Sequence, residues 1–106
     1  MTAEALLLMM VDVPDEHEAA FNTWYNEVHI PELLTLPGFV SAERFRHVGP
    51  GIRYLALYRL TNAAAADSDA FQQWRAKSES TELWASRFTE RHRLLYEKIF
   101  TAEAEN

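Results

Sequence analysis

One block of the chain, residues 21–46, constrains the fold most strongly, and it reads FNTWYNEVHIPELLTLPGFVSAERFR. Phe21, Trp24 and Val28 are spaced by three and four residues, which predicts the apolar face of an amphipathic helix. Pro31 has no N–H to bond to the preceding turn, so the helix should kink or end there. The next Pro-Gly pair predicts a turn into a strand. The block therefore predicts a helix, a break and a strand in close succession.

The rest of the chain supplies further strands and helices. Residues 5–13 (ALLLMMVDV) are almost continuously apolar and end at a proline, which predicts a short strand covered on both faces. Asp15 is expected to cap the first helix, with Glu18 completing a capping box. The other expected elements are a first helix from about 15 to 30 with an irregular continuation toward 36, strands over 39–48 and 52–61 joined as a hairpin at Gly-Pro-Gly, a helix from 67 or 68 to about 77, another from 80 or 81, and a strand over 94–100.

This order, β-α-β-β-α-β, predicts an α+β ferredoxin-like fold with a four-stranded antiparallel sheet, built as a single domain over residues 1–106. Its helices should cover one face of the sheet. Leu55 and Leu57 point away from that face, so the opposite face is also apolar and would be bare in a monomer. Two copies packed sheet to sheet around a two-fold axis would cover it, which predicts a homodimer.

Composition disfavours several classes of function. Sixteen acidic against ten basic residues give a net charge of −6, so neither nucleic acid nor an anionic membrane is an expected partner. The chain has no cysteine, which excludes a disulfide framework and a thiol nucleophile. The N-terminal stretch lacks a basic leader and a long apolar span, and a cytoplasmic protein is expected. No phosphate-binding loop or nucleophile elbow is present, and the histidines lack metal-ligand spacing, so neither a cofactor nor a metal is expected.

The block at residues 21–46 and the ending Tyr96-Glu-Lys-Ile-Phe resemble the dimeric α+β barrel superfamily, and within it the small EthD-like proteins. That superfamily includes monooxygenases of aromatic polyketides, muconolactone isomerases, polyketide cyclases and dehalogenating or haem-handling members, besides proteins with no assigned role. The resemblance implies a cofactor-free pocket between sheet and helices that takes a planar, hydrophobic small molecule. It does not imply one reaction, because this fold carries many.

His29 is the first candidate for chemistry. In several relatives a histidine in an H-x-P setting at the end of the first helix lines the pocket, and His29-Ile30-Pro31 matches that setting. An imidazole can give or take a proton near neutral pH, the step shared by isomerisation, cyclisation and elimination. The alternative is that His29 only caps the helix C-terminus, where the dipole favours a cation.

The other candidate site residues surround His29 in the helix or lie on the hairpin. Tyr25 lies one turn before His29 and is expected to assist it as a catalytic partner. Arg44 could bind a substrate carboxylate through two hydrogen bonds; the alternative is that the hairpin arginines join an ion-pair network across the strands or the subunit boundary. Trp24 and Trp84 have core spacing, with a second role as pocket walls, and Tyr54 and Tyr58 face either the pocket or the dimer seam. The expected substrate-binding residues are Asn22, Trp24, Asn26, Tyr54, Tyr58, Arg44 and Trp84.

These patterns support two functional hypotheses. The first is a cofactor-independent enzyme of isomerase, cyclase or lyase type that acts on an aromatic or polyketide-like intermediate, with His29 as general acid or base. Cofactor-free oxygenation would depend on an activatable substrate more than on a recognisable residue. The second is a non-catalytic dimer that binds a small ligand or assists a partner enzyme. The two differ in whether His29 lies beside an open cavity with a partner for proton transfer.

Overall fold

Four strands form one antiparallel sheet in the computed structural model, which describes residues 3–105. The strand order is β2-β3-β1-β4, the order of a ferredoxin-like βαββαβ domain. The predicted α+β ferredoxin-like fold is therefore confirmed. The strands are β1 (Ala5–Asp12), β2 (Phe39–Arg46), β3 (Tyr54–Leu60) and β4 (Glu90–Glu97).

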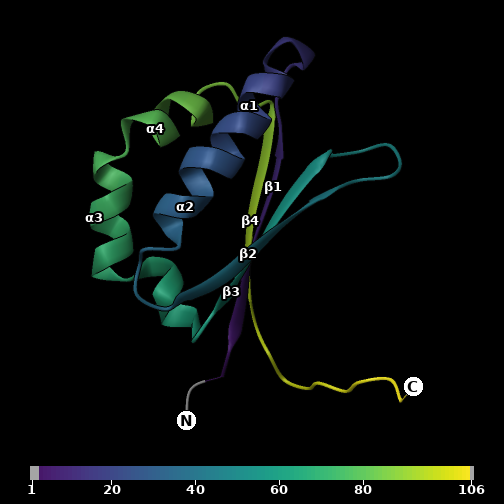
Figure 1. Cartoon of the computed structure of the whole chain (residues 1–106), viewed down its shortest axis with the longest axis vertical. Helices are drawn as coiled ribbons and strands as arrows, with labels where there is room; N and C mark the ends of the chain where they lie inside the picture. The colour runs from purple at the N-terminus through teal and green to yellow at the C-terminus, as the bar shows by residue number, and fades with distance from the viewer. Residues whose placement is uncertain (1–2, 106) are drawn as a thin grey trace.

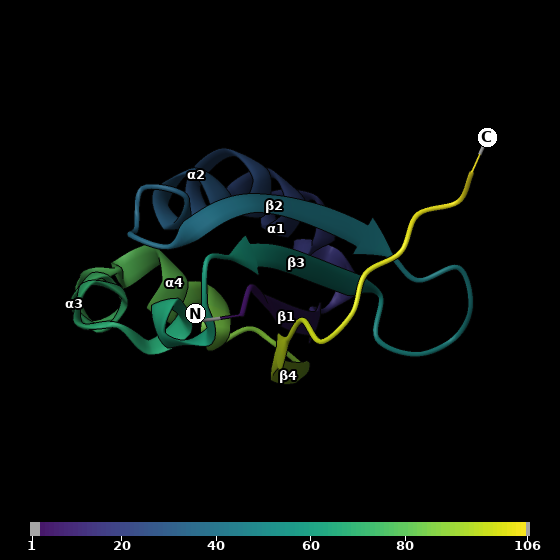
Figure 2. The same cartoon turned by 90° about the horizontal axis from the view of Figure 1, so that it is seen from below.

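The helices lie together on one side of this sheet, as Figure 1 shows, while the hairpin loop between β2 and β3 and the C-terminal tail extend away from the helices. Figure 2 shows α1 and α2 beside β2, with α3 and α4 forming a second group. The helical elements are the 3-10 helix η1 (Asp15–His17), α1 (Glu18–Trp24), the π-helix η2 (Tyr25–His29), α2 (Ile30–Leu33), the 3-10 helix η3 (Ala63–Asp67), α3 (Asp69–Lys77) and α4 (Glu79–Ala85).

The core fills the space between the sheet and the helices. Alternate residues of β1, among them Leu7 and Val11, are buried against the helices. Leu7 lies opposite Tyr58 in the antiparallel register of β1 and β3. The Tyr58 ring is therefore on the same face of the sheet as Leu7 and is also buried. A cluster of aromatic side chains surrounds Phe21 of α1, which is fully buried. Its ring packs edge-on against the ring of Tyr25 and lies close to further aromatic rings.

The first helix differs from the predicted phase. Val28 was expected on the inner face, but its side chain is 37% exposed, while Tyr25 and His29 are 3% and 9% exposed and face inward. The cause is the π-helix, whose hydrogen bonds span one residue more than those of an α-helix, so that the inward face moves around the axis. Pro31 does not end the helix, because α2 continues to Leu33.

Two predicted ends are also corrected. Asp15 does not cap the helix, because it lies inside η1, and no capping box forms with Glu18. The last strand ends at Glu97 instead of Phe100, because its partner β1 begins at Ala5 and offers no further backbone to pair with. The predicted turn before β2 holds: Gly38 has φ +86°, and a Cβ there would lie 2.5 Å from the Cβ of Ala65.

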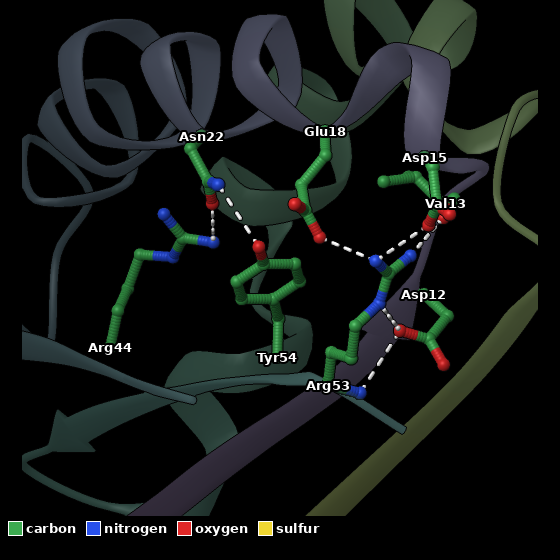
Figure 3. Close-up of polar contacts among 8 residues, drawn as sticks. All are labelled: Asp12, Val13, Asp15, Glu18, Asn22, Arg44, Arg53 and Tyr54. Carbon is green, nitrogen blue, oxygen red and sulfur yellow. Dashed lines mark hydrogen bonds and ion pairs between the residues drawn. The ribbon is translucent and has the colours of Figure 1, made fainter. Parts of the chain in front are cut away.

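Arg53 ties the hairpin to the start of the first helix, and Figure 3 shows its guanidinium between the acidic side chains. Its Nη1 lies 2.9 Å from the carboxylate of Asp15 and also bonds to Glu18, while Nε lies 3.1 Å from Asp12. Its Nη2 donates to the carbonyl of Val13. Arg53 thus forms an ion-pair network, one of the two alternatives for the hairpin arginines. Two of its partners, Asp15 and Glu18, are the residues that were expected to form a capping box.

The sheet face opposite the helices is largely apolar. Leu8 and Leu57 on the central strands are half-buried there, and Phe45 on the edge strand is 48% exposed.

No helix within residues 3–105 is long and apolar enough to cross a bilayer.

Candidate functional site

A cavity of about 240 Å³ lies between the sheet and the helices. Its floor comes from β1, β3 and β4, and its walls come from α1, η2, α2, α3 and α4. Most of the lining is apolar or aromatic, which is typical of sites for small organic ligands. The lining residues are Leu7, Met9, Val11, Trp24, Tyr25, His29, Leu33, Tyr58, Phe71, Trp74, Arg75, Thr81, Ala85, Phe88, Arg91 and Arg93.

His29 reaches this cavity from the π-helix, on the face that the π-helix turns inward. Its Nδ1 lies 3.3 Å from Oγ1 of Thr81 on α4. The hydroxyl of Ser78 donates to the same Thr81 oxygen at 2.7 Å, and Ser78 also caps α4 by accepting from the N–H of Thr81. A helix cap therefore holds the residue that orients the imidazole.

Aromatic rings enclose His29. The Trp24 ring stacks on it at 4.5 Å between centroids, and the rings of Tyr25 and Trp74 lie at 4.8 and 5.6 Å. Burial, with smaller contributions from the charges of Arg75 and Arg44, lowers the pKa of His29 to about 4. The imidazole is therefore neutral at pH 7, which leaves one of its nitrogens with a free lone pair.

Two tyrosines meet beside the histidine. The Tyr58 hydroxyl donates to the Tyr25 hydroxyl at 3.1 Å, and both side chains line the cavity. Burial raises the pKa of each phenol, so both stay protonated at neutral pH. Because the Tyr58 hydrogen is used in this bond, the Tyr25 hydrogen is left to donate to another acceptor.

Arg44 organises a second group of predicted residues, and Figure 3 shows it beside Asn22 and Tyr54. Its Nη2 and Nη1 lie 2.9 Å from the side-chain oxygens of Asn22 and Asn26, and Asn22 donates to the Tyr54 hydroxyl at 3.1 Å. The guanidinium also lies 4.6 Å from the centroid of the Tyr25 ring, a cation–π contact. This group supports Tyr25 from the side of β2, and none of Arg44, Asn22, Asn26 and Tyr54 belongs to the cavity lining.

The structure thus brings four predicted site residues to the cavity: Trp24, Tyr25, His29 and Tyr58. Trp84 lies one layer behind, stacked on Trp24 at 5.7 Å. The cavity is also lined by residues that were not among the predicted site residues: Trp74, Arg75, Thr81, Arg91 and Arg93. No local sequence signal marks these residues, because they come from α3, α4 and β4 and meet His29 only through the fold. Within residues 3–105, no three His, Asp or Glu side chains are grouped as metal ligands would be.

Comparison with models of protein families identifies the family of this chain. A family model described as "Domain of unknown function (DUF4286)" matches residues 5–102, which is nearly the whole chain. The chain belongs to this family. No curated protein matches the sequence of this DUF4286 member significantly.

Solved structures share the fold of the DUF4286 chain at low sequence identity. A Bordetella bronchiseptica protein described as an antibiotic biosynthesis monooxygenase superposes with a TM-score of 0.75 at 16% identity, covering 93% of this chain and 100% of that one. A Bacillus halodurans protein of the ethyl tert-butyl ether D (EthD) family gives 0.67 at 14%, covering 91% and 99%. A heme-degrader of Mycobacterium tuberculosis with two hemes bound in its active site gives 0.63 at 17%, covering 93% and 99%. The likeness to the EthD-like and monooxygenase-like α+β barrel proteins is confirmed at the level of fold.

Proposed function

We propose that this chain is a cofactor-independent enzyme that transfers protons on an aromatic or polyketide-like small molecule, with His29 as the acid–base residue. It would work in the cytoplasm as a homodimer whose apolar sheet faces pack together. The observation that carries the proposal is a buried, neutral imidazole that borders an aromatic cavity and has one nitrogen engaged by Thr81.

The contact between His29 and Thr81 can form in two ways, because the Thr81 hydroxyl either accepts a hydrogen from Nδ1 or donates one to it. We propose the first arrangement, in which the Thr81 oxygen accepts hydrogens from both Ser78 and Nδ1 of His29. In that tautomer Nε2 carries the lone pair and is the base. Thr81 would therefore orient His29, a role that differs from the assistance expected of Tyr25.

The low basicity of His29 restricts the substrate. A base with a pKa of about 4 works efficiently only on an acidic proton, such as one on a carbon between two carbonyl groups or on a phenol. Such carbons are what polyketide-like compounds offer. Tyr25, whose hydroxyl hydrogen is not used by Tyr58, would donate to the oxygen on which negative charge develops.

The three reaction types share the removal of the C–H proton and differ only in the second step. Return of the proton from Nε2 to a different carbon is isomerisation. Attack of the carbanion on a carbonyl, with the proton passing from Nε2 to the new alkoxide, is cyclisation. Departure of a neighbouring group, which takes the proton from Nε2, is elimination. The shared first step therefore tests the proposal without knowledge of the product.

Hydrogen–deuterium exchange tests that step. A panel of aryl 1,3-diketones and aromatic lactones would be incubated with the protein in D₂O, and the loss of the acidic C–H signal followed by NMR. We expect the protein to accelerate exchange for some members of the panel, and His29→Gln to slow it by 10²-fold or more, on the order of a general-base contribution. His92→Gln, at an exposed position on β4, is the matched control. Exchange that is equally fast in His29→Gln would contradict the proposal.

A second candidate is a non-catalytic ligand-binding or accessory dimer. The same low pKa of His29 favours it, since a weak base can serve equally as a hydrogen-bond acceptor in a binding pocket. Quenching of tryptophan fluorescence by the panel, with no deuterium exchange for any member that binds, would favour this candidate.

A further inference from the structure

The charges at the cavity are of one sign. Its lining includes Arg75, Arg91 and Arg93, and it contains no aspartate or glutamate. The whole chain has the opposite bias, with sixteen acidic and ten basic residues. Arg75 is half-buried and Arg91 and Arg93 are exposed, so the three guanidinium groups border the cavity where water still reaches them and a ligand could meet them.

The arginines have little compensation from within the chain. Arg75 on α3 has one carboxylate partner, Glu82 at 3.3 Å, and that side chain is 79% exposed, so the pair is screened by water. Arg93 on β4 donates to the carbonyl of Ala66 at 2.6 Å, a bond to a neutral group. Arg91 takes part in none of the ion pairs or side-chain hydrogen bonds within residues 3–105.

A further unused donor belongs to the same lining. The indole Nε1 of Trp24 is buried, and it has no hydrogen-bond partner among the described residues. Trp24 stacks on His29 and lines the cavity, so this unpaired donor belongs to a residue of the cavity wall beside the proposed base. A buried donor left unpaired costs stability, and an acceptor on a ligand would remove that cost.

We propose that the cavity selects an aromatic ligand that carries an anionic oxygen group, a carboxylate or an enolate, which Arg75 and Arg91 hold from opposite elements. This rests on the proposed function, because it takes aromatic binding at His29 as given and adds the charge of the ligand. The planar guanidinium groups suit two parallel hydrogen bonds to a carboxylate. They would also stabilise the enolate that forms when His29 removes a proton.

Binding of 2-naphthoate and 2-naphthamide, measured by calorimetry near neutral pH at low salt, tests the inference. The two probes share ring and shape and differ in charge. We expect 2-naphthoate to bind about tenfold tighter or more, as a charge-assisted hydrogen bond would give. Arg91→Gln and Arg75→Gln should each reduce this preference several-fold. Arg46→Gln removes the same charge from an exposed strand position outside the cavity lining, and should leave the preference unchanged.

The outcomes separate the two proposals. Equal affinity for both probes would overturn the inference and leave the proposed function standing. A preference for 2-naphthoate that survives in both Arg91→Gln and Arg75→Gln would also overturn it, because the anion would then be held elsewhere. Failure of both probes to bind would count against the aromatic cavity itself, and so against both proposals.

Discussion

The Nδ1 atom of His29 lies 3.3 Å from Oγ1 of Thr81, across 52 residues of sequence. This contact joins the π-helix to α4, and Ser78 extends it to the N-terminus of α4. The cap of one helix therefore determines the orientation of the imidazole on another. The orientation of His29 therefore depends on the packing of the π-helix against α4 and not on either helix alone.

Replacing Thr81 tests this relationship. Thr81→Val keeps the shape and removes the hydroxyl, so we expect a loss of about 1–2 kcal/mol in the free energy of unfolding, since a buried ring nitrogen loses its partner. The ¹⁵N NMR spectrum should show a changed ratio of the two His29 tautomers. Thr81→Ser retains the hydroxyl and should keep the tautomer of the native chain; an unchanged tautomer ratio in Thr81→Val would show that the contact does not set it.

Stability should depend on pH through His29. Burial lowers the pKa of His29 from 6.5 to about 4, so between these values the unfolded chain binds the proton and the folded chain does not. Protonation therefore favours unfolding, and stability present above pH 6.5 is lost as the pH falls toward 4. The full effect is about 3 kcal/mol, of which about 2 kcal/mol falls between about pH 7.5 and about pH 5.

Urea unfolding of the native chain and of His29→Gln at those two pH values measures this effect. The variant should lose about 2 kcal/mol less than the native chain between them. His92→Gln removes an exposed imidazole and should follow the native chain. Parallel pH profiles for the native chain and His29→Gln would mean that the imidazole titrates alike in the folded and unfolded states.

The π-helix explains why the fold was easier to predict than the site. Element order and the apolar run of β1 follow from periodicity and turn residues, which are local signals. The inward rotation of Tyr25 and His29 at the expense of Val28 depends on a change of helix type, which the sequence does not mark. A strict α-helical period therefore placed His29 on the flank of the helix instead of in the core.

The remaining wall of the cavity was hidden for a different reason. Thr81 and Arg91 lie far from His29 in sequence and come to the cavity only when α4 packs and β4 pairs with β1. The last strand was expected to begin at residue 94, yet the charged residues 90–93 already belong to β4, an edge strand whose backbone pairing overrides its charge. Pairing of this kind is decided by the partner strand.

Arg53 should contribute to stability through its network. Arg53→Met removes bonds to Asp12, Asp15, Glu18 and the carbonyl of Val13, so we expect a loss of about 1–2 kcal/mol at low salt. Unfolding in added salt should shrink the difference from the native chain, because exposed charges are screened. Arg59→Met, at an exposed position of β3, is the control and should change stability by less than about 0.5 kcal/mol. A difference that does not respond to salt would assign the effect of Arg53 to packing.

The homodimer can be tested on the open face of the sheet. Leu57→Arg places a charge among half-buried apolar residues of β3, and we expect a monomer by light scattering coupled to size exclusion, since a buried unpaired charge is costly. Leu83→Arg adds the same charge on α4, at a side chain that is 50% exposed on the helix side, and should leave the dimer intact. A native chain that elutes as a monomer at all concentrations would refute the dimer.

The central claim is that His29 meets a ligand in the cavity, and a crystal structure after soaking with phenolic and lactone compounds tests it most directly. We predict ligand density between the sheet and the helices, with a ligand oxygen or acidic carbon within hydrogen-bond distance of Nε2 of His29. Density elsewhere, or a cavity closed by its own side chains with Nε2 bonded to the protein, would contradict the claim.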